Sequence, residues 1–127
     1  MPTRDSLKGP ERLGRRSLEL DAVYCAGAGV ITVLARRRVG EIIGVAPSLV
    51  GTAGVATLVW AGGVAAASRR RRWRGPVAAI AVANVVASTA LAAGAVHEER
   101  GSGRVLLAVV SAQVASFAAV QTWALSR

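Results

Sequence analysis

Four stretches of this 127-residue chain contain no charged side chain, and they constrain its fold more than any motif does. They are 14, 27, 22 and 22 residues long, and they comprise residues 22–35, 42–68, 75–96 and 105–126. A helix needs roughly 20 residues to cross a bilayer core about 30 Å thick, so the last three stretches can each span a membrane. The first stretch reaches that length together with its flanking residues. The pattern predicts an all-α integral membrane protein, an antiparallel four-helix bundle.

Proline and glycine positions place the ends of the helices. Pro47 and Pro76 each favour a helix start, because the first helical residue has no intrahelical partner for an N–H group. Residues 97–103 hold three charges and two glycines and separate the last two helices. We expect a basic, flexible cytoplasmic tail over 1–16 and an interfacial turn over 39–46. One transmembrane domain is expected over 17–127, with spans near 17–35, 47–68, 76–96 and 104–125.

Basic residues lie between the uncharged stretches rather than within them. Sixteen Lys and Arg against seven Asp and Glu give a formal charge of +9, which by itself would suggest nucleic acid or an anionic surface. Near the ends of spans, however, Lys and Arg favour the cytoplasmic side of the membrane. Four spans place eleven cations on one side and five on the other. We therefore expect a multi-pass plasma-membrane protein with both termini in the cytoplasm and no nucleic-acid partner.

Five arginines lie together between the second and third predicted spans: Arg69, Arg70, Arg71, Arg72 and Arg74. If the first stretch did not span, this block would have to be translocated and the cations would divide ten against six, so we prefer four spans. The block could bind anionic phospholipid headgroups, with about 1 kcal/mol per cation near an anionic leaflet. It could equally serve only to fix the topology. Trp73 favours the second interpretation, because a single indole is typical of a membrane interface.

Polar side chains within the spans need a partner or water, so their positions are informative. We expect Asp21, Asn84 and Gln121 to form a cluster in the cytoplasmic half of the bundle, with Gln113 at its deeper end. Such a cluster could bind a cation, a proton or a polar headgroup, with Asp21 as its titratable member. It could instead fix helix rotation through interhelical hydrogen bonds worth about 0.6–2 kcal/mol each. We favour this structural role.

The remaining composition argues against several classes of protein. Cys25 is the only cysteine and His97 the only histidine, so neither a disulfide scaffold nor a zinc site can be built. We find no phosphate-binding glycine loop followed by lysine and no nucleophile-elbow serine. We therefore expect no cofactor, no metal, no catalytic residue and no enzymatic activity. Small residues recur at helical spacing and favour close packing, among them Gly51, Gly54, Gly62 and Gly63 in the second span.

Several short runs resemble small four-span integral membrane proteins of high-GC actinobacteria. The runs are Leu-Asp-Ala-Val-Tyr-Cys at 20–25, Gly-Val-Ala-Pro at 44–47, Ala-Asn at 83–84 and the segment 115–121. The resemblance covers nearly the whole chain through loose motifs, and the bias toward Arg, Ala, Val and Gly suits such a genome. It implies a fold and a compartment, and no catalytic residue.

Two functions fit these features. The first is a nonenzymatic accessory or structural membrane subunit, whose partner could be anionic lipid, a second copy of the chain or another membrane protein. The alternative is a small proton- or cation-coupled transporter that uses Asp21. Small multidrug resistance proteins are similar in length and number of spans and carry an acidic residue in the first helix. Asp21 matches poorly, because it lies near a helix end and aromatic residues make up only 4% of the chain.

Overall fold

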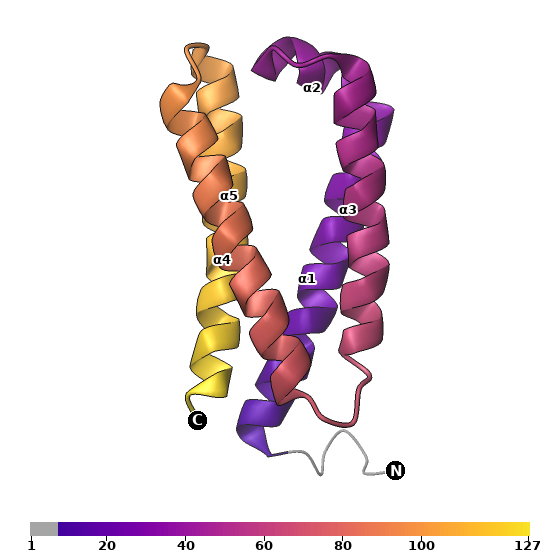
Figure 1. Ribbon diagram of the computed structural model, residues 1–127, viewed down its shortest axis with the longest axis vertical. Coiled ribbons are helices and arrows are strands. Elements are labelled where there is room, and N and C mark those ends of the chain that lie inside the picture. Colours follow the sequence, from indigo (N-terminus) through magenta and orange to yellow (C-terminus); the bar gives the residue numbers. More distant parts are fainter. Residues whose placement is uncertain (1–7) are drawn as a thin grey trace.

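The computed structural model describes residues 8–127, which form helices and short connections without strands. The helices are α1 (Gly9–Leu34), α2 (Arg36–Ile43), α3 (Pro47–Ala67), α4 (Arg74–His97) and α5 (Gly101–Leu125) (Figure 1). All but α2 are long and apolar enough to cross a membrane. The prediction of an all-α, four-span antiparallel bundle is therefore confirmed. Which end faces the cytoplasm stays a prediction.

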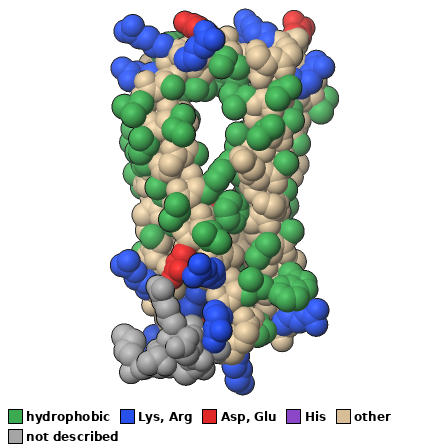
Figure 2. Space-filling model, turned by 180° about the vertical axis from the view of Figure 1, so that it is seen from behind, with side chains coloured by type: hydrophobic (Ala, Val, Ile, Leu, Met, Phe, Trp, Pro, Cys, Tyr) green, Lys and Arg blue, Asp and Glu red, His purple; other side chains and the backbone are tan. Residues whose placement is uncertain are grey.

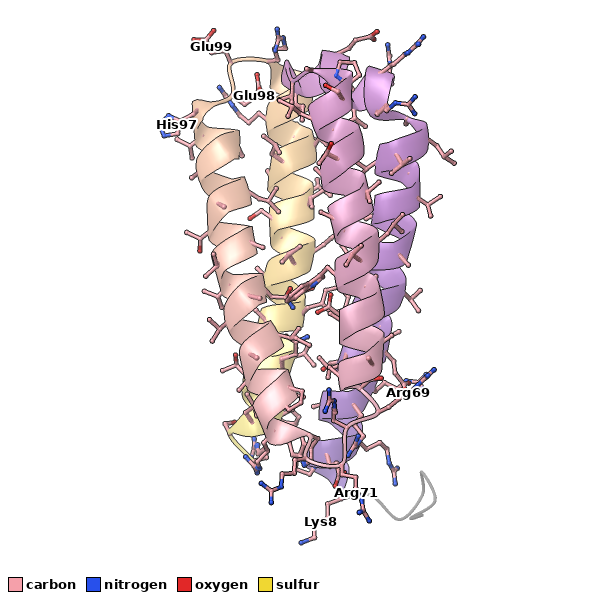
Figure 3. The ribbon with its side chains drawn as sticks, turned by 45° about the vertical axis from the view of Figure 1, so that its right-hand side comes forward. Lys8, Arg69, Arg71, His97, Glu98 and Glu99 are labelled. Atoms are coloured by element: carbon pink, nitrogen blue, oxygen red, sulfur yellow. The ribbon has the colours of Figure 1, made fainter. Side chains whose placement is uncertain are left out.

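Both ends of the bundle carry basic side chains, with more of them at one end than at the other. Figure 3 shows Lys8, Arg69 and Arg71 at one end, and His97, Glu98 and Glu99 at the other. The first end also holds the C-terminus of the chain, and we call it the arginine end. The short helix α2 lies across the opposite end (Figure 1). The chain thus crosses the bundle four times, as the charge-free stretches require.

The first helix begins at Gly9, eight residues before the predicted start of the first span. Pro10 lies in its first turn, and Arg15 forms an ion pair of 2.9 Å with Glu11 one turn earlier. Residues 9–16 therefore belong to α1 and not to a separate tail, because local pairing and contacts with the loop after α3 stabilise helix there. Residues 1–7 of that tail lie outside the described residues.

The predicted turn over 39–46 is wrong for residues 39–43, because the helix α2 extends to Ile43. Gly44 ends this helix in a left-handed conformation with φ of 70°, which glycine adopts without a steric penalty. At Gly103 of α5, a Cβ atom would lie 2.8 Å from the carbonyl oxygen of Ile42. The end of α2 therefore lies directly against the start of α5.

The four long helices pack as two pairs, α1 with α3 and α4 with α5. The pairs converge at the arginine end and diverge toward α2 (Figure 1). Figure 2 shows an opening between them in the half of the molecule nearer α2. Where they converge, a small apolar core joins both pairs: Leu18, Ala22, Val64, Val77 and Ile80.

Glycine permits the close crossing within the first pair. A Cβ atom on Gly54 would lie 2.7 Å from Cγ2 of Val33, and one on Gly29 would lie 3.0 Å from the carbonyl oxygen of Gly54. The expected role of Gly54 in close packing is therefore confirmed. Gly62 and Gly63 differ, since a Cβ atom on either would meet nothing within 4 Å.

Candidate functional site

Three of the predicted polar residues meet inside the bundle and bond to one another. Asn84 Nδ2 donates to Asp21 Oδ2 at 2.7 Å and to Gln121 Oε1 at 3.1 Å. Gln121 Nε2 donates to Asp21 Oδ2 at 3.0 Å, which closes the triangle. Exposed fractions are 1% for Asp21, 5% for Asn84 and 0% for Gln121. We call these three residues the polar triangle, and it links α1, α4 and α5.

Helical periodicity brings the triangle together. On α4 the buried positions Val77, Ile80, Asn84 and Ser88 follow one another at intervals of three or four residues. Asp21 lies three residues after Leu18 of the apolar core, on the same buried side of α1. The buried side of α5 is likewise formed at intervals of three residues, by Ala118, Gln121 and Ala124. The triangle residues therefore lie on the same buried helix faces as the apolar core at the arginine end, and their side chains point into the bundle.

Within the described residues, three side chains donate hydrogen bonds to the Asp21 carboxyl group. Besides the two amides, the Cys25 thiol lies 3.4 Å from Oδ1, one helical turn away. Neutral donors therefore reach both oxygens of this carboxyl group. Cys25 was not among the polar residues expected in the cluster. The spacing of four residues was the signal for this contact.

Gln113 lies outside the triangle, contrary to the prediction. Its side chain is exposed and accepts a hydrogen bond of 2.6 Å from the Tyr24 hydroxyl. Tyr24 also packs on Phe117, with ring centroids 5.5 Å apart. Eight residues separate Gln113 from Gln121, which turns the helix by about 80° beyond two full turns and moves it about 12 Å along the axis. This rotation takes Gln113 to a different side of α5.

Arg15 organises the connection between α3 and α4, which the sequence did not reveal. Its guanidinium group donates to the carbonyl oxygens of Ser68 at 2.9 Å, Arg70 at 2.7 Å and Arg71 at 3.1 Å. Only 17% of its side chain is exposed. Cations are favourable at helix C-termini, where carbonyl groups lack partners, and Ser68 caps α3. One partly buried cation on α1 therefore fixes the backbone from which the loop arginines project.

The predicted arginine block divides into two kinds of residue. Arg74 donates to the carbonyl oxygen of Leu125 at 2.8 Å, and its guanidinium carbon lies 5.0 Å from the centre of the Trp73 ring. Arg74 thus supports the end of α5. All five are exposed, and the other four lie in the loop before α4: Arg69, Arg70, Arg71 and Arg72.

Trp73 packs against α1. A Cβ atom at Gly14 would lie 2.7 Å from Cζ3 of the indole ring, so the ring rests directly on the helix backbone. Trp73 also contacts the apolar core at the arginine end. The indole therefore joins the loop to the first helix, in addition to the interfacial position that the sequence suggested.

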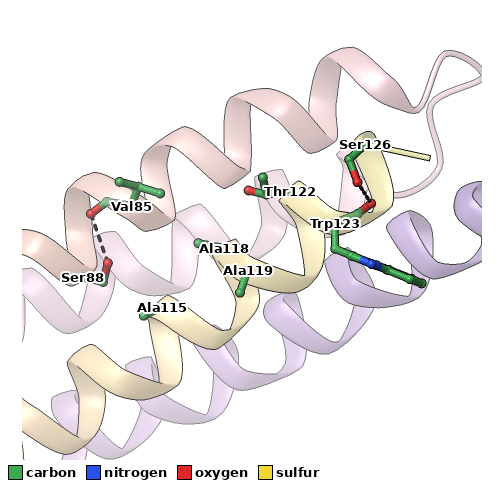
Figure 4. Close-up of a pocket in the computed structure, with 8 residues that line it drawn as sticks. All are labelled: Val85, Ser88, Ala115, Ala118, Ala119, Thr122, Trp123 and Ser126. Carbon is green, nitrogen blue, oxygen red and sulfur yellow. Dashed lines mark hydrogen bonds between the residues drawn. The ribbon is translucent and has the colours of Figure 1, made fainter.

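A groove of about 530 Å³ lies between α4 and α5 on the outer surface (Figure 4). Two of its hydroxyl groups bond to their own helices, Ser88 to the Val85 carbonyl at 3.0 Å and Ser126 to the Trp123 carbonyl at 2.7 Å. The rest of the lining consists of small or apolar groups and Thr122. This groove suits acyl chains or another helix better than a polar substrate.

Comparison with protein-family models, with curated proteins and with solved structures found no match for this chain. Its function must therefore be argued from the polar triangle, the loop and the outer faces of the helices. The resemblance to actinobacterial membrane proteins stays a prediction.

Proposed function

We propose that this protein is a nonenzymatic accessory or structural subunit of the plasma membrane. The observation that carries the proposal is the closed hydrogen bonding of the polar triangle. Each of its three members bonds to the other two, and the donors and acceptors come from three different helices. Such a network sets the rotation of the helices against one another. A substrate site would instead present polar groups to a cavity.

The outer surface is consistent with a partner in the membrane. Large apolar side chains point outward along the spans, for example Val23 at 70%, Val59 at 73% and Val96 at 76% exposed. In lipid, helices associate through close packing of small residues and not through burial of apolar area. The groove between α4 and α5, lined by Ala115, Ala118 and Ala119, offers this kind of surface. A helix of another subunit could pack there.

The experiment is purification of the tagged protein from its native membrane in a mild detergent. We expect a second membrane protein at a constant ratio, and we expect that Ala119→Leu, which narrows the groove, reduces its recovery. Ala108→Leu, also exposed on α5, serves as the control. A protein that purifies alone from native membranes, and that carries out transport on its own, would contradict the subunit proposal.

One further observation favours a second candidate, a small proton- or cation-coupled transporter. Asp21 is the ionisable member of the polar triangle, and Figure 2 shows an opening between the two helix pairs nearer α2. Asp21 is only 1% exposed in the structure, so uptake of an ion by its carboxyl group would require the helix pairs to part as far as the polar triangle, and it would be the first step of such a cycle. Reconstituted vesicles test this directly: proton-coupled flux that disappears in Asp21→Asn, with folding and insertion retained, would support transport. Equal permeability of vesicles with and without the protein would exclude it.

A further inference from the structure

A groove of about 810 Å³ lies where the end of α3 meets the loop to α4. One wall is formed by small residues of α3, namely Gly63, Ala66 and Ala67, with Pro76 of α4. The rim is formed by three loop arginines: Arg70, Arg71 and Arg72. Apolar and cationic surfaces therefore meet in one concave feature at the membrane boundary.

The apolar wall is open toward the membrane. Gly63 and Ala66 are exposed and lie three residues apart, so they share one face of α3. A Cβ atom on Gly63 would meet nothing within 4 Å, so no other part of the described chain covers this position. A wall of such small side chains leaves room for an acyl chain to lie along the helix.

The loop that carries the cationic rim is held in place by hydrogen bonds from Arg15. Arg15 fixes the carbonyl groups of Ser68, Arg70 and Arg71, while the side chains of the rim arginines are exposed. The loop backbone is thus ordered before any ligand binds. A preorganised site loses less conformational entropy on binding, and guanidinium groups bind phosphate through paired hydrogen bonds.

We propose that this groove binds one anionic phospholipid of the surrounding leaflet. The phosphate group lies among the guanidinium groups of Arg70, Arg71 and Arg72, and an acyl chain lies against Gly63 and Ala66. The apolar wall, continuous with the membrane-facing surface of α3, favours a lipid over a soluble phosphate. This site goes beyond the subunit role proposed above and does not depend on it.

A lipid site and a plain topology anchor make different predictions for single arginines. An anchor acts through total charge, so Arg69 and Arg71 would be equivalent. The groove is lined by Arg71 and not by Arg69, although both are exposed in the same loop. Arg69→Gln is therefore a matched control for Arg71→Gln. In the same way, Gly62→Leu controls for Gly63→Leu, because both glycines are open but only Gly63 lines the groove.

The experiment is native mass spectrometry of the full chain in detergent, with dioleoyl phosphatidylglycerol or dioleoyl phosphatidylcholine added. We expect one phosphatidylglycerol to be retained in preference to phosphatidylcholine. Arg71→Gln should weaken its binding by about fivefold, the effect of one lost cation. Gly63→Leu should weaken it by at least as much, since the leucine side chain occupies the wall. Circular dichroism checks that each variant keeps its helices.

The proposal requires that Arg71→Gln weaken phosphatidylglycerol binding more than Arg69→Gln, and that Gly63→Leu weaken it more than Gly62→Leu. The proposal is overturned if Arg69→Gln weakens phosphatidylglycerol binding as much as Arg71→Gln, because the block then acts only as diffuse charge. It is also overturned if Gly63→Leu binds the lipid as tightly as Gly62→Leu, or if the unmodified protein does not prefer phosphatidylglycerol.

Discussion

Asn84 is the residue whose loss should most clearly separate a structural network from incidental polar contacts. Its amide nitrogen donates both to Asp21 on α1 and to Gln121 on α5. Replacement by alanine removes both interhelical hydrogen bonds and takes from Gln121 Oε1 the donor seen in the structure. Interhelical bonds in membranes contribute about 0.6–1.7 kcal/mol each, and an unsatisfied buried oxygen costs about 1 kcal/mol or more. We therefore expect Asn84→Ala to lower the free energy of unfolding by about 2–4 kcal/mol.

The assay is unfolding in mixed micelles with increasing sodium dodecyl sulfate, followed by circular dichroism. Ser88→Ala is the matched control, because Ser88 lies on the same buried side of α4 but its hydroxyl donates to Val85 of its own helix. Its loss should cost less than about 1 kcal/mol. A double-mutant cycle of Asn84→Ala with Gln121→Ala should show a coupling energy of about 0.5–3 kcal/mol. Equal costs for Asn84→Ala and Ser88→Ala, or no coupling with Gln121, would refute the interpretation of the triangle as a structural network.

Three further predictions follow from the packing and the charges. Gly54→Ala should lower the free energy of unfolding by about 1–3 kcal/mol, because the added Cβ atom would press on Val33. Gly62→Ala should not destabilise the protein, since its Cβ atom would meet nothing. Equal effects of the two substitutions in the same micelle assay would contradict the close crossing of α1 and α3. Arg15→Gln should speed tryptic cleavage within residues 69–74 severalfold, since its three hydrogen bonds to loop carbonyl groups are lost. Arg16 is exposed, so Arg16→Gln should leave the cleavage rate unchanged. Protection of the loop in both variants would argue against the role of Arg15. A fluorescent-protein fusion at the C-terminus should fluoresce and an alkaline phosphatase fusion should be inactive, because the larger number of cations places this end in the cytoplasm. The opposite pattern would show that the predicted orientation is wrong.

The bilayer explains why the four spans could be predicted from the sequence. In lipid the backbone must satisfy its own hydrogen bonds, so a charge-free stretch of about 20 residues has few alternatives to a helix. The starts at Pro47 and near Pro76 follow from the same local rules. The polar triangle could be predicted from the sequence for a related reason. In an apolar solvent, Asp21, Asn84 and Gln121 have few hydrogen-bond partners except one another. The prediction failed for Gln113, because its side chain bonds to Tyr24 on another side of the bundle.

The features that could not be predicted lie at the ends of the bundle, where water relaxes these constraints. Residues 9–16 have the composition of a solvated tail, with two glycines and a proline, and the spacing of four residues between Glu11 and Arg15 is a weak helix signal by itself. Their partners are distant in sequence: Arg15 bonds to the loop after α3, and Gly14 accommodates the ring of Trp73. Both contacts depend on α1 and the loop meeting at the same end of the bundle, which only the assembled topology decides. The same assembly places three arginines of the block on the rim of an apolar groove, an arrangement that the charge pattern alone could not predict.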